Sequence, residues 1–376
     1  MSLVAAALAC VLAGSLVYCV LVLLAVRDYL GGPALLECAA PPPISVLKPL
    51  AGRDVGLADN LRSFFTQDYR DFDLLFAVRS PDDPAIAFVR ELQSEFPHVP
   101  SRLIVTGDPP YPNAKVFSLD RMLAEARNDL IVMSDSDIRV GNSFLRMVAA
   151  EFADEKIALA SCPYRAIGSE GTWSKLEAEG LNTEFLGGLL VARLLEGVKF
   201  AIGPTIIVRK AVLSAIGGVG SFKDYLAEDF MMGKLAAEQG YGVILSGNIV
   251  EHRIGGRDMR SNFNHRLRWN RGTRRSRPAG YVGQLFMHPL PIAILTVIAQ
   301  PSWWFILIPA IVLRGLAAWA TSKTVLGTPP NWRRAGIQDL LSFAFWIVGF
   351  FGNTVVWRGR RYRLLSDGRF RSFKTE

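Results

Sequence analysis

The chain has 376 residues, of which 50% are hydrophobic and only 20% are charged, and its formal net charge at pH 7 is +8. A composition this apolar excludes an intrinsically disordered protein. An ordinary soluble enzyme is excluded too, because the runs 2–26, 279–313 and 340–357 contain no Asp, Glu, Lys or Arg. We therefore expect a folded protein that is anchored in a membrane.

The first apolar run predicts an uncleaved transmembrane anchor over residues 1–27, with its N-terminus outside. A helix needs about 20 apolar residues to cross the hydrocarbon core of a bilayer. The sequence has no positive residues before the run, and the run is longer than the core of a typical signal peptide. The four cysteines show neither metal-ligand nor disulfide spacing, which favours a reducing compartment for the soluble part.

The region 279–358 predicts a membrane segment with two to three spans or re-entrant segments, followed by a basic tail over 359–376. Two passes within 279–313 would return the chain to the cytoplasm, in agreement with the positive-inside tendency. A third pass would place the arginine-rich tail outside. Either the tail breaks this tendency, or one run, such as 340–357, is re-entrant or lies at the interface.

Between these ends, residues 40–260 predict one α/β domain with a mostly parallel sheet. Strand-like and helical patterns alternate along it. Strands are expected at 44–47, 74–78, 103–106 and 130–133, and helices at 57–66, 85–96, 117–126 and 230–239. Ligands of such sheets bind beyond the carboxyl ends of the strands, so the polar residues that follow each strand become candidates.

Acidic residues follow two of these strands. Asp82 and Asp83 come after 74–78, and Asp135 and Asp137 come directly after 130–133. In an extended segment the side chains of residues i and i+2 point the same way, so this pair can share one hard cation such as Mg²⁺ or Mn²⁺ with a diphosphate. An isolated pair of this kind is more often a solvated turn, and its place after a strand favours the metal site.

A third acidic pair, Glu228 and Asp229, precedes the helix at 230–239 and by itself is equally typical of a helix N-terminus. An arginine-rich helix is then predicted over 261–278. Its arginines share faces that suit phosphate oxygens, while Leu267 and Trp269 suit the bilayer interface. Plain anchoring to anionic lipid is the alternative, and the two roles are compatible.

The order of these motifs resembles the D,D,D,(Q/R)xxRW signature of membrane-bound family 2-like glycosyltransferases. More narrowly, the chain resembles the ceramide glucosyltransferase family (family 21), including its bacterial hopanoid-associated relatives. The segments that carry the resemblance are 46–50 (VLKPL), 82–85 (DDPA), 113–115 (NAK), 135–140 (DSDIRV), 227–230 (AEDF) and 266–269 (RLRW). The resemblance implies a GT-A-type domain with transmembrane helices at both ends.

The resemblance also assigns roles to the acidic residues. It implies that Asp83 lies near the nucleotide and that Asp135 binds the metal and the diphosphate with Asp137 beside it. It implies that Asp229 is the general base. One base without a covalent nucleophile predicts a single displacement with inversion at the sugar.

The basic and aromatic part of the signature is matched by Arg268 and Trp269, which the resemblance places near the diphosphate or the acceptor. His265 stands where the family usually has Gln or Arg, and this departure favours the bacterial branches. Plausible contacts to the nucleotide sugar are Lys48, Asn113 and Lys115, although ordinary surface charge is as good an explanation for the two lysines.

The predicted function is transfer of a sugar from a UDP-sugar, UDP-glucose first, to a lipid hydroxyl, with Mg²⁺ or Mn²⁺. A hopanoid or another lipid N-acetylglucosaminyl- or hexosyltransferase is the alternative. A processive polysaccharide synthase would need more membrane segments, and a non-catalytic lipid-binding scaffold would not need the four aspartates. We expect a multi-pass protein of the bacterial inner membrane with a cytoplasmic catalytic domain and no nucleic-acid partner.

Overall fold

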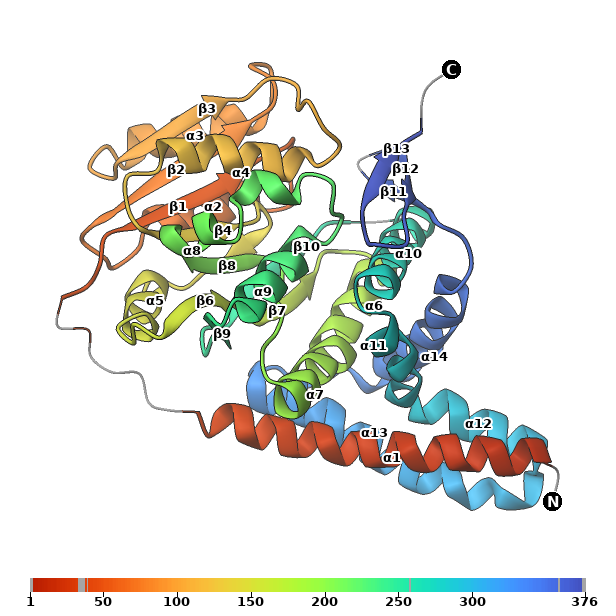
Figure 1. Cartoon of the computed structure of the whole chain (residues 1–376). Coiled ribbons are helices and arrows are strands. Elements are labelled where there is room, and N and C mark those ends of the chain that lie inside the picture. Colours follow the sequence, from red (N-terminus) through yellow and green to blue (C-terminus); the bar gives the residue numbers. More distant parts are fainter. Residues whose placement is uncertain (1–2, 33–37, 39, 257, 358, 374–376) are drawn as a thin grey trace.

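The centre of the molecule is a seven-stranded sheet with the order β3-β2-β1-β4-β8-β6-β9 (Figure 1). The computed structural model describes residues 3–32, 38, 40–256, 258–357 and 359–373. The strands of this sheet are β1 (Ile44–Pro49), β2 (Phe72–Val78), β3 (Ser101–Val105), β4 (Leu130–Ser134), β6 (Ile157–Ser161), β8 (Thr205–Arg209) and β9 (Gly242–Leu245). Neighbouring strands are parallel except at β8. This topology confirms the predicted α/β class with a mostly parallel sheet.

Helices cover both faces of the sheet, because its central strands are apolar on both sides. Every residue of β1, β2 and β4 is buried, as expected for parallel strands between helices. Successive residues of a strand, such as Val46 and Leu47 of β1, belong to two separate hydrophobic clusters. The helices around the sheet are α2 (Leu57–Phe65), α3 (Ala85–Glu95), α4 (Ala114–Glu125), α5 (Phe144–Glu151), α8 (Lys210–Ala215) and α9 (Glu228–Glu238).

The strands and helices predicted within 44–133 are all present, with ends that differ by a few residues. The largest difference is at α4, which begins at Ala114 where the sequence predicts 117. Asn113 explains the earlier start, because its side-chain oxygen accepts a hydrogen bond from the backbone N of Val116 at 3.1 Å and so caps the first turn.

A smaller sheet lies beside the end of β4 and consists of β5 (Ile138–Arg139), β10 (Val250–Ile254) and β7 (Tyr164–Gly168). A bent helical segment follows β7 and consists of α6 (Thr172–Gly180), the π-helical turn η1 (Leu181–Phe185) and α7 (Leu186–Glu196). Figure 1 shows α7 between the sheet domain and α1 (Leu3–Leu30), against which it packs. The anchor is therefore attached to the α/β domain through this segment.

Among the described residues, two helices are long and apolar enough to cross a membrane, Leu3–Leu30 and Pro301–Val325. A third candidate is the pair Pro278–Met287 and Pro289–Ala299, which is bent by 65° and can be one broken span or a re-entrant loop. The first agrees with the predicted anchor, and the others fall in the predicted membrane region. The helices of this region are α11 (Pro278–Gly283), η3 (Gln284–Met287), α12 (Pro289–Ala299), η4 (Pro301–Ile306), α13 (Leu307–Trp319) and η5 (Ala320–Val325). Both α12 and α13 pack against α1 (Figure 1).

The last apolar run, 340–357, does not form one helix. Its first part belongs to α14 (Trp332–Gly349), and its last part forms the strand β11 (Thr354–Trp357) after a turn at Gly352, whose φ is +75°. The rest of α14 is polar, and its Asp339 makes an ion pair with Arg314 at 2.6 Å. This run is therefore too short and too interrupted to span a bilayer alone.

The predicted basic tail is wrong as a description of residues 359–373, because they are folded. β11 pairs with β12 (Arg360–Leu364), which pairs with β13 (Phe370–Ser372), in an antiparallel sheet. Tyr362 and Leu364 are buried on one face of β12 while Arg361 and Arg363 are exposed, so a period-two pattern underlies the basic composition. Arg358 and residues 374–376 lie outside the described residues.

Candidate active site

The carboxyl ends of β1 and β4 bring a buried lysine against the Asp135 segment. Lys48, which is fully buried, donates hydrogen bonds to the hydroxyl of Ser134 at 3.3 Å and to the backbone oxygen of Asp135 at 2.8 Å. Its ammonium also lies 3.8 Å from the ring centroid of Phe64. Burial lowers the pKa of Lys48 to about 7, although the nearby Asp135 and Asp137 oppose this shift. Lys48 therefore positions the start of the loop that carries Asp135.

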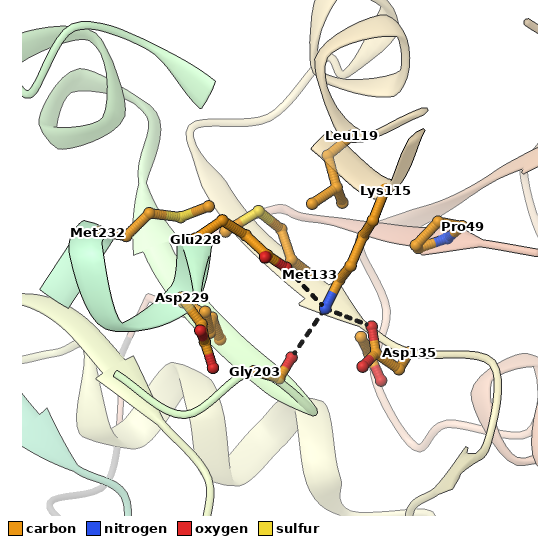
Figure 2. A pocket seen from close by; sticks show the side chains of 11 residues that line it. Pro49, Lys115, Leu119, Met133, Asp135, Gly203, Glu228, Asp229 and Met232 are labelled. Atoms are coloured by element: carbon orange, nitrogen blue, oxygen red, sulfur yellow. Dashed lines mark hydrogen bonds and ion pairs between the residues drawn. The ribbon is translucent and has the colours of Figure 1, made fainter. Parts of the chain in front are cut away.

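A second lysine occupies the centre of the pocket (Figure 2). The ammonium of Lys115 lies 2.7 Å from Asp135 Oδ1 and 3.4 Å from Glu228 Oε1, and it donates to the backbone oxygen of Gly203 at 3.4 Å. Burial disfavours its charge, but Asp135 and Glu228 outweigh burial and raise the pKa of Lys115. Burial also raises the pKa of Asp135, against the effect of Lys115. The ammonium thus sits among acidic groups that attract cations.

Asp229 lies at the start of α9 on the other side of this pocket (Figure 2). Burial, followed by the neighbouring charge of Glu228, raises the pKa of Asp229 to about 6, while Lys115 opposes the shift. Gly203 faces it so closely that a Cβ there would lie 2.7 Å from Asp229 Oδ2. A carboxylate with a raised pKa beside a cation-binding cluster is suited to accept a proton near neutral pH.

Asn113 connects the α4 and α9 sides of the pocket. Its amide nitrogen donates to the backbone oxygen of Tyr225 at 2.9 Å and to Glu228 Oε2 at 3.3 Å. Its oxygen accepts the bond that caps α4, so three of the four hydrogen bonds that the side chain can make are to protein groups. Asn113 thus positions the two sides of the pocket, and the predicted nucleotide contact stays a prediction. Glu228, which the sequence analysis treats only as part of an acidic pair, binds both Asn113 and Lys115.

Asp137 is held by a histidine from the smaller sheet. Its Oδ2 lies 3.1 Å from Nε2 of His252, whose ring packs edge-on against Tyr164 at 5.2 Å between centroids. Burial would raise the pKa of Asp137, but His252 prevails and lowers it. No sequence spacing links His252 to Asp137, and only the pairing of β10 with β5 brings the two residues together.

Asp83 lies in the loop between β2 and α3 and binds backbone groups. Its two oxygens accept hydrogen bonds from the backbone N of Gly52 at 3.0 and 3.1 Å, and Oδ1 accepts one from Ala85 N at 2.9 Å. It thereby joins the loop after β1 to the start of α3. Asp83 is half-buried beside the same edge of the sheet but does not line the Lys115 pocket.

The arginine-rich helix is present as α10 (Met259–Ser276). His265 on this helix pairs with Glu177 of α6, Nδ1 to Oε1 at 2.8 Å, and its ring centroid lies 4.9 Å from that of Trp269. Asn262 donates to the other oxygen of Glu177 at 2.6 Å. Trp269 in turn faces Phe185 at 6.3 Å. Glu177 thus binds two residues of α10, Asn262 and His265, and no sequence motif points to it.

Two arginines near the end of α10, which the sequence offers as phosphate ligands, bind oxygens of the protein itself. Arg274 donates hydrogen bonds to the backbone oxygens of Phe350 and Gly352 and to the side chain of Asn353. Arg271 donates to the backbone oxygens of Phe351 and Thr354. These oxygens belong to the turn between α14 and β11 and to the first residue of β11, so the two arginines fix the path of the chain between the helix and the strand.

Replacing Arg274 by alanine is expected to lower the free energy of unfolding by about 1–3 kcal/mol, because the oxygens of Phe350, Gly352 and Asn353 lose charge-assisted hydrogen bonds. Thermal unfolding of the purified protein measures this. Nucleotide binding should change little. The control is Arg360→Ala, which removes an exposed arginine from β12. Equal stability of the two variants would contradict this role of Arg274.

Asp135 and Asp137 fit a divalent cation that is shared with a ligand. One oxygen of each carboxylate lies against a nitrogen, Nζ of Lys115 for Asp135 and Nε2 of His252 for Asp137, which leaves a second oxygen of each for a metal. Among the described residues no group of three or more His, Cys, Asp or Glu side chains could hold a metal ion. A cation at this pair would therefore need further oxygen ligands, which a diphosphate provides.

The sequence is related to characterised transferases. Residues 7–370 match the profile of glycosyl transferase family 21. The chain is 32% identical over 230 residues to ceramide glucosyltransferase 1 of Caenorhabditis elegans, a match that covers 61% of this chain and 49% of the relative. It is 30% identical over 213 residues to ceramide glucosyltransferase 3 of the same organism, with 56% and 46% covered. The chain thus spans about half the length of these curated relatives.

A solved structure shares the fold. The chain resembles a mannosyltransferase from Pyrobaculum calidifontis with a TM-score of 0.56 and 15% sequence identity, over 93% of this chain and 99% of that one. This likeness and the mostly parallel sheet confirm the predicted GT-A-type fold. Since the family profile extends over nearly the whole chain, the protein belongs to glycosyl transferase family 21.

Proposed function

We propose that this protein transfers a sugar from a UDP-sugar to the hydroxyl of a lipid, with inversion at the sugar and with a divalent metal. The observation that carries the proposal is the cluster of Asp135, Lys115, Glu228 and Asp229 around one pocket at the carboxyl ends of the strands. The family supports a sugar transferase, and the position of the pocket is where α/β sheets bind ligands.

The donor would bind through its diphosphate at Asp135 and Asp137. Mg²⁺ or Mn²⁺, when bound there, would neutralise the negative charge that develops on the leaving diphosphate. The mannosyltransferase of Pyrobaculum calidifontis was solved with GDP-Man and Mn²⁺, which supports a divalent metal in this fold. Lys115, which has an ion pair with Asp135, can turn to a phosphate oxygen once the metal binds, and Arg268 would add a second positive charge.

Asp229 would act as the general base. Its carboxylate takes the proton of the acceptor hydroxyl while the hydroxyl oxygen forms a bond to the anomeric carbon of the sugar. The bond between this carbon and the β-phosphate oxygen breaks, and its electron pair leaves with UDP. The acceptor oxygen enters on the face opposite the leaving group, so a single displacement inverts the anomeric configuration.

The pH dependence of transfer should report on Asp229. Because the pKa of Asp229 is raised to about 6 and only the ionised form accepts a proton, kcat/KM should fall about tenfold per pH unit below that value. Rates measured between about pH 5 and pH 8 test this. Glu228→Gln removes a neighbouring negative charge and should shift the fall to lower pH. A rate that stays level down to pH 5 would contradict the assignment.

The acceptor is proposed to be a lipid for two reasons. Helices that could span a membrane pack against the α/β domain through α7, and the curated relatives are ceramide glucosyltransferases. The same relatives make UDP-glucose the first donor to test. We further propose that the α/β domain is cytoplasmic in a bacterial inner membrane, where soluble sugar nucleotides are available.

The experiment that tests the function uses the purified protein in lipid nanodiscs. It is incubated with radiolabelled UDP-glucose, UDP-galactose and UDP-N-acetylglucosamine, each with ceramide, a hopanoid or diacylglycerol, with and without EDTA. We expect label to reach one lipid and EDTA to prevent it. Label in no lipid under any condition would refute the transferase, and full activity in EDTA would refute the metal.

A further inference from the structure

The C-terminal sheet β11–β13 lies against the chain segment that leads to the proposed base. Its buried residues pack around Leu226, three positions before Asp229. The backbone N of Phe370 donates to the backbone oxygen of Asp224 at 2.8 Å, and the guanidinium of Arg369 lies over the ring of Tyr225 at 5.4 Å. The residues that form this apolar cluster are Leu226, Val355, Tyr362, Leu364 and Phe370, with Trp357 packed against them.

The same sheet also contacts the helix that carries the RW pair. The guanidinium of Arg268 lies over the ring of Trp357 at 5.7 Å. The indole of Trp357 is itself positioned by Phe370 and Tyr362, with ring centroids 5.8 and 6.4 Å away. Arg271 and Arg274 of α10 hold the chain just before β11. Figure 1 shows this sheet beside α10, and the contacts involve the second half of the helix.

We propose that β11–β13 is a positioning element of the transferase site, in which Trp357 orients Arg268 toward the donor diphosphate and the sheet fixes the segment that precedes Asp229. This inference rests on the proposed function, because it takes Arg268 as a diphosphate ligand and Asp229 as the base. The strands β12 and β13, which the sequence predicts to be part of a basic tail, thereby have a role in the site.

The physical reason lies in the flexibility of arginine. A guanidinium on a long side chain loses much conformational entropy when it binds a phosphate. A tryptophan face restricts the side chain beforehand through a cation–π contact, so less freedom remains to be lost when the donor binds. Trp357 is thus expected to affect donor affinity more than the rate of the chemical step.

The test compares variants of the full-length protein in detergent, by UDP binding and by the steady-state kinetics of transfer. Trp357→Ala should raise the dissociation constant of UDP and the KM of the donor by about three- to tenfold while kcat changes little. Trp357→Phe should restore most of the affinity, because phenylalanine keeps a ring face. Thermal unfolding of each variant shows whether the protein is folded.

The matched control is Phe373→Ala. Phe373 makes the same kind of contact within the sheet, with Arg361 at 5.8 Å, but not with α10. We expect it to leave UDP binding unchanged. The double variant Arg268→Gln with Trp357→Ala should bind UDP no more weakly than Arg268→Gln alone, since the tryptophan acts through the arginine.

Three outcomes would overturn the proposal, and the first two differ in whether the proposed diphosphate role of Arg268 survives. If Arg268→Gln weakens UDP binding but a folded Trp357→Ala does not, the positioning role is refuted and the proposed transferase stands. If Arg268→Gln leaves UDP binding unchanged, the role of Arg268 at the diphosphate fails together with the inference. Additive effects in the double variant would also refute an action of Trp357 through Arg268.

Discussion

Asp229→Asn is expected to abolish sugar transfer while UDP-sugar binding remains measurable. Asparagine has nearly the same shape but cannot take the proton of the acceptor hydroxyl. Loss of a general base costs about 10²- to 10⁴-fold in rate. The pKa of Asp229, raised to about 6, leaves the carboxylate ionised at neutral pH and makes it a stronger base than an ordinary aspartate. Initial rates of transfer and the affinity for the donor are measured side by side.

The control for this variant is Glu238→Gln, which changes an exposed carboxylate at the other end of α9. It should behave as the wild type in both measurements. An Asp229→Asn protein that turns over at nearly the wild-type rate would show that another group is the base. Glu228 would then be the next candidate, because it lines the same pocket.

Asp135→Asn is expected to have the second largest effect, a fall in transfer rate of about 10²- to 10³-fold. The variant removes a negative charge that Lys115 and the proposed metal share. Donor binding should lose its response to added Mn²⁺, whereas for Asp229→Asn that response should persist. Donor affinity measured against Mn²⁺ concentration separates the two roles.

Asp129→Asn serves as the matched control, because Asp129 precedes the same strand β4 at its opposite end. Its activity and its response to Mn²⁺ should be those of the wild type. If Asp135→Asn keeps the Mn²⁺ response of the wild type, the metal does not bind at this carboxylate.

Much of the α/β domain could be predicted from the sequence, because its elements are defined by local patterns. The strand at 130–133 is a short apolar run bounded by polar residues, and it is present as Leu130–Ser134. Asp135 is the next residue after this strand, and ligands of parallel sheets bind beyond the carboxyl ends of the strands, so it could be predicted as a site residue. The start of α4 was predicted less accurately, because a single side chain, Asn113, caps its first turn.

The partners of the site residues could not be predicted in the same way. His252 and Asp137 are 115 positions apart, as are Asn113 and Glu228. No local pattern links such residues, and their contact depends on which strands pair and how α9 lies against α4. Asp83 is a similar case, since its contact with the loop after β1 depends on the neighbouring position of β1 and β2.

The sequence by itself determined the apolar anchor, the α/β order and the acidic and basic motifs, because hydrophobic periodicity and strand-end polarity act over short stretches of chain. Only the tertiary structure decided what each charged side chain does. Arg271 and Arg274 bind carbonyls of the turn that follows α14, while Arg268 faces Trp357 of a sheet that composition alone describes as a tail. A guanidinium binds whichever acceptor or ring the fold brings to it, so its role depends on distant segments.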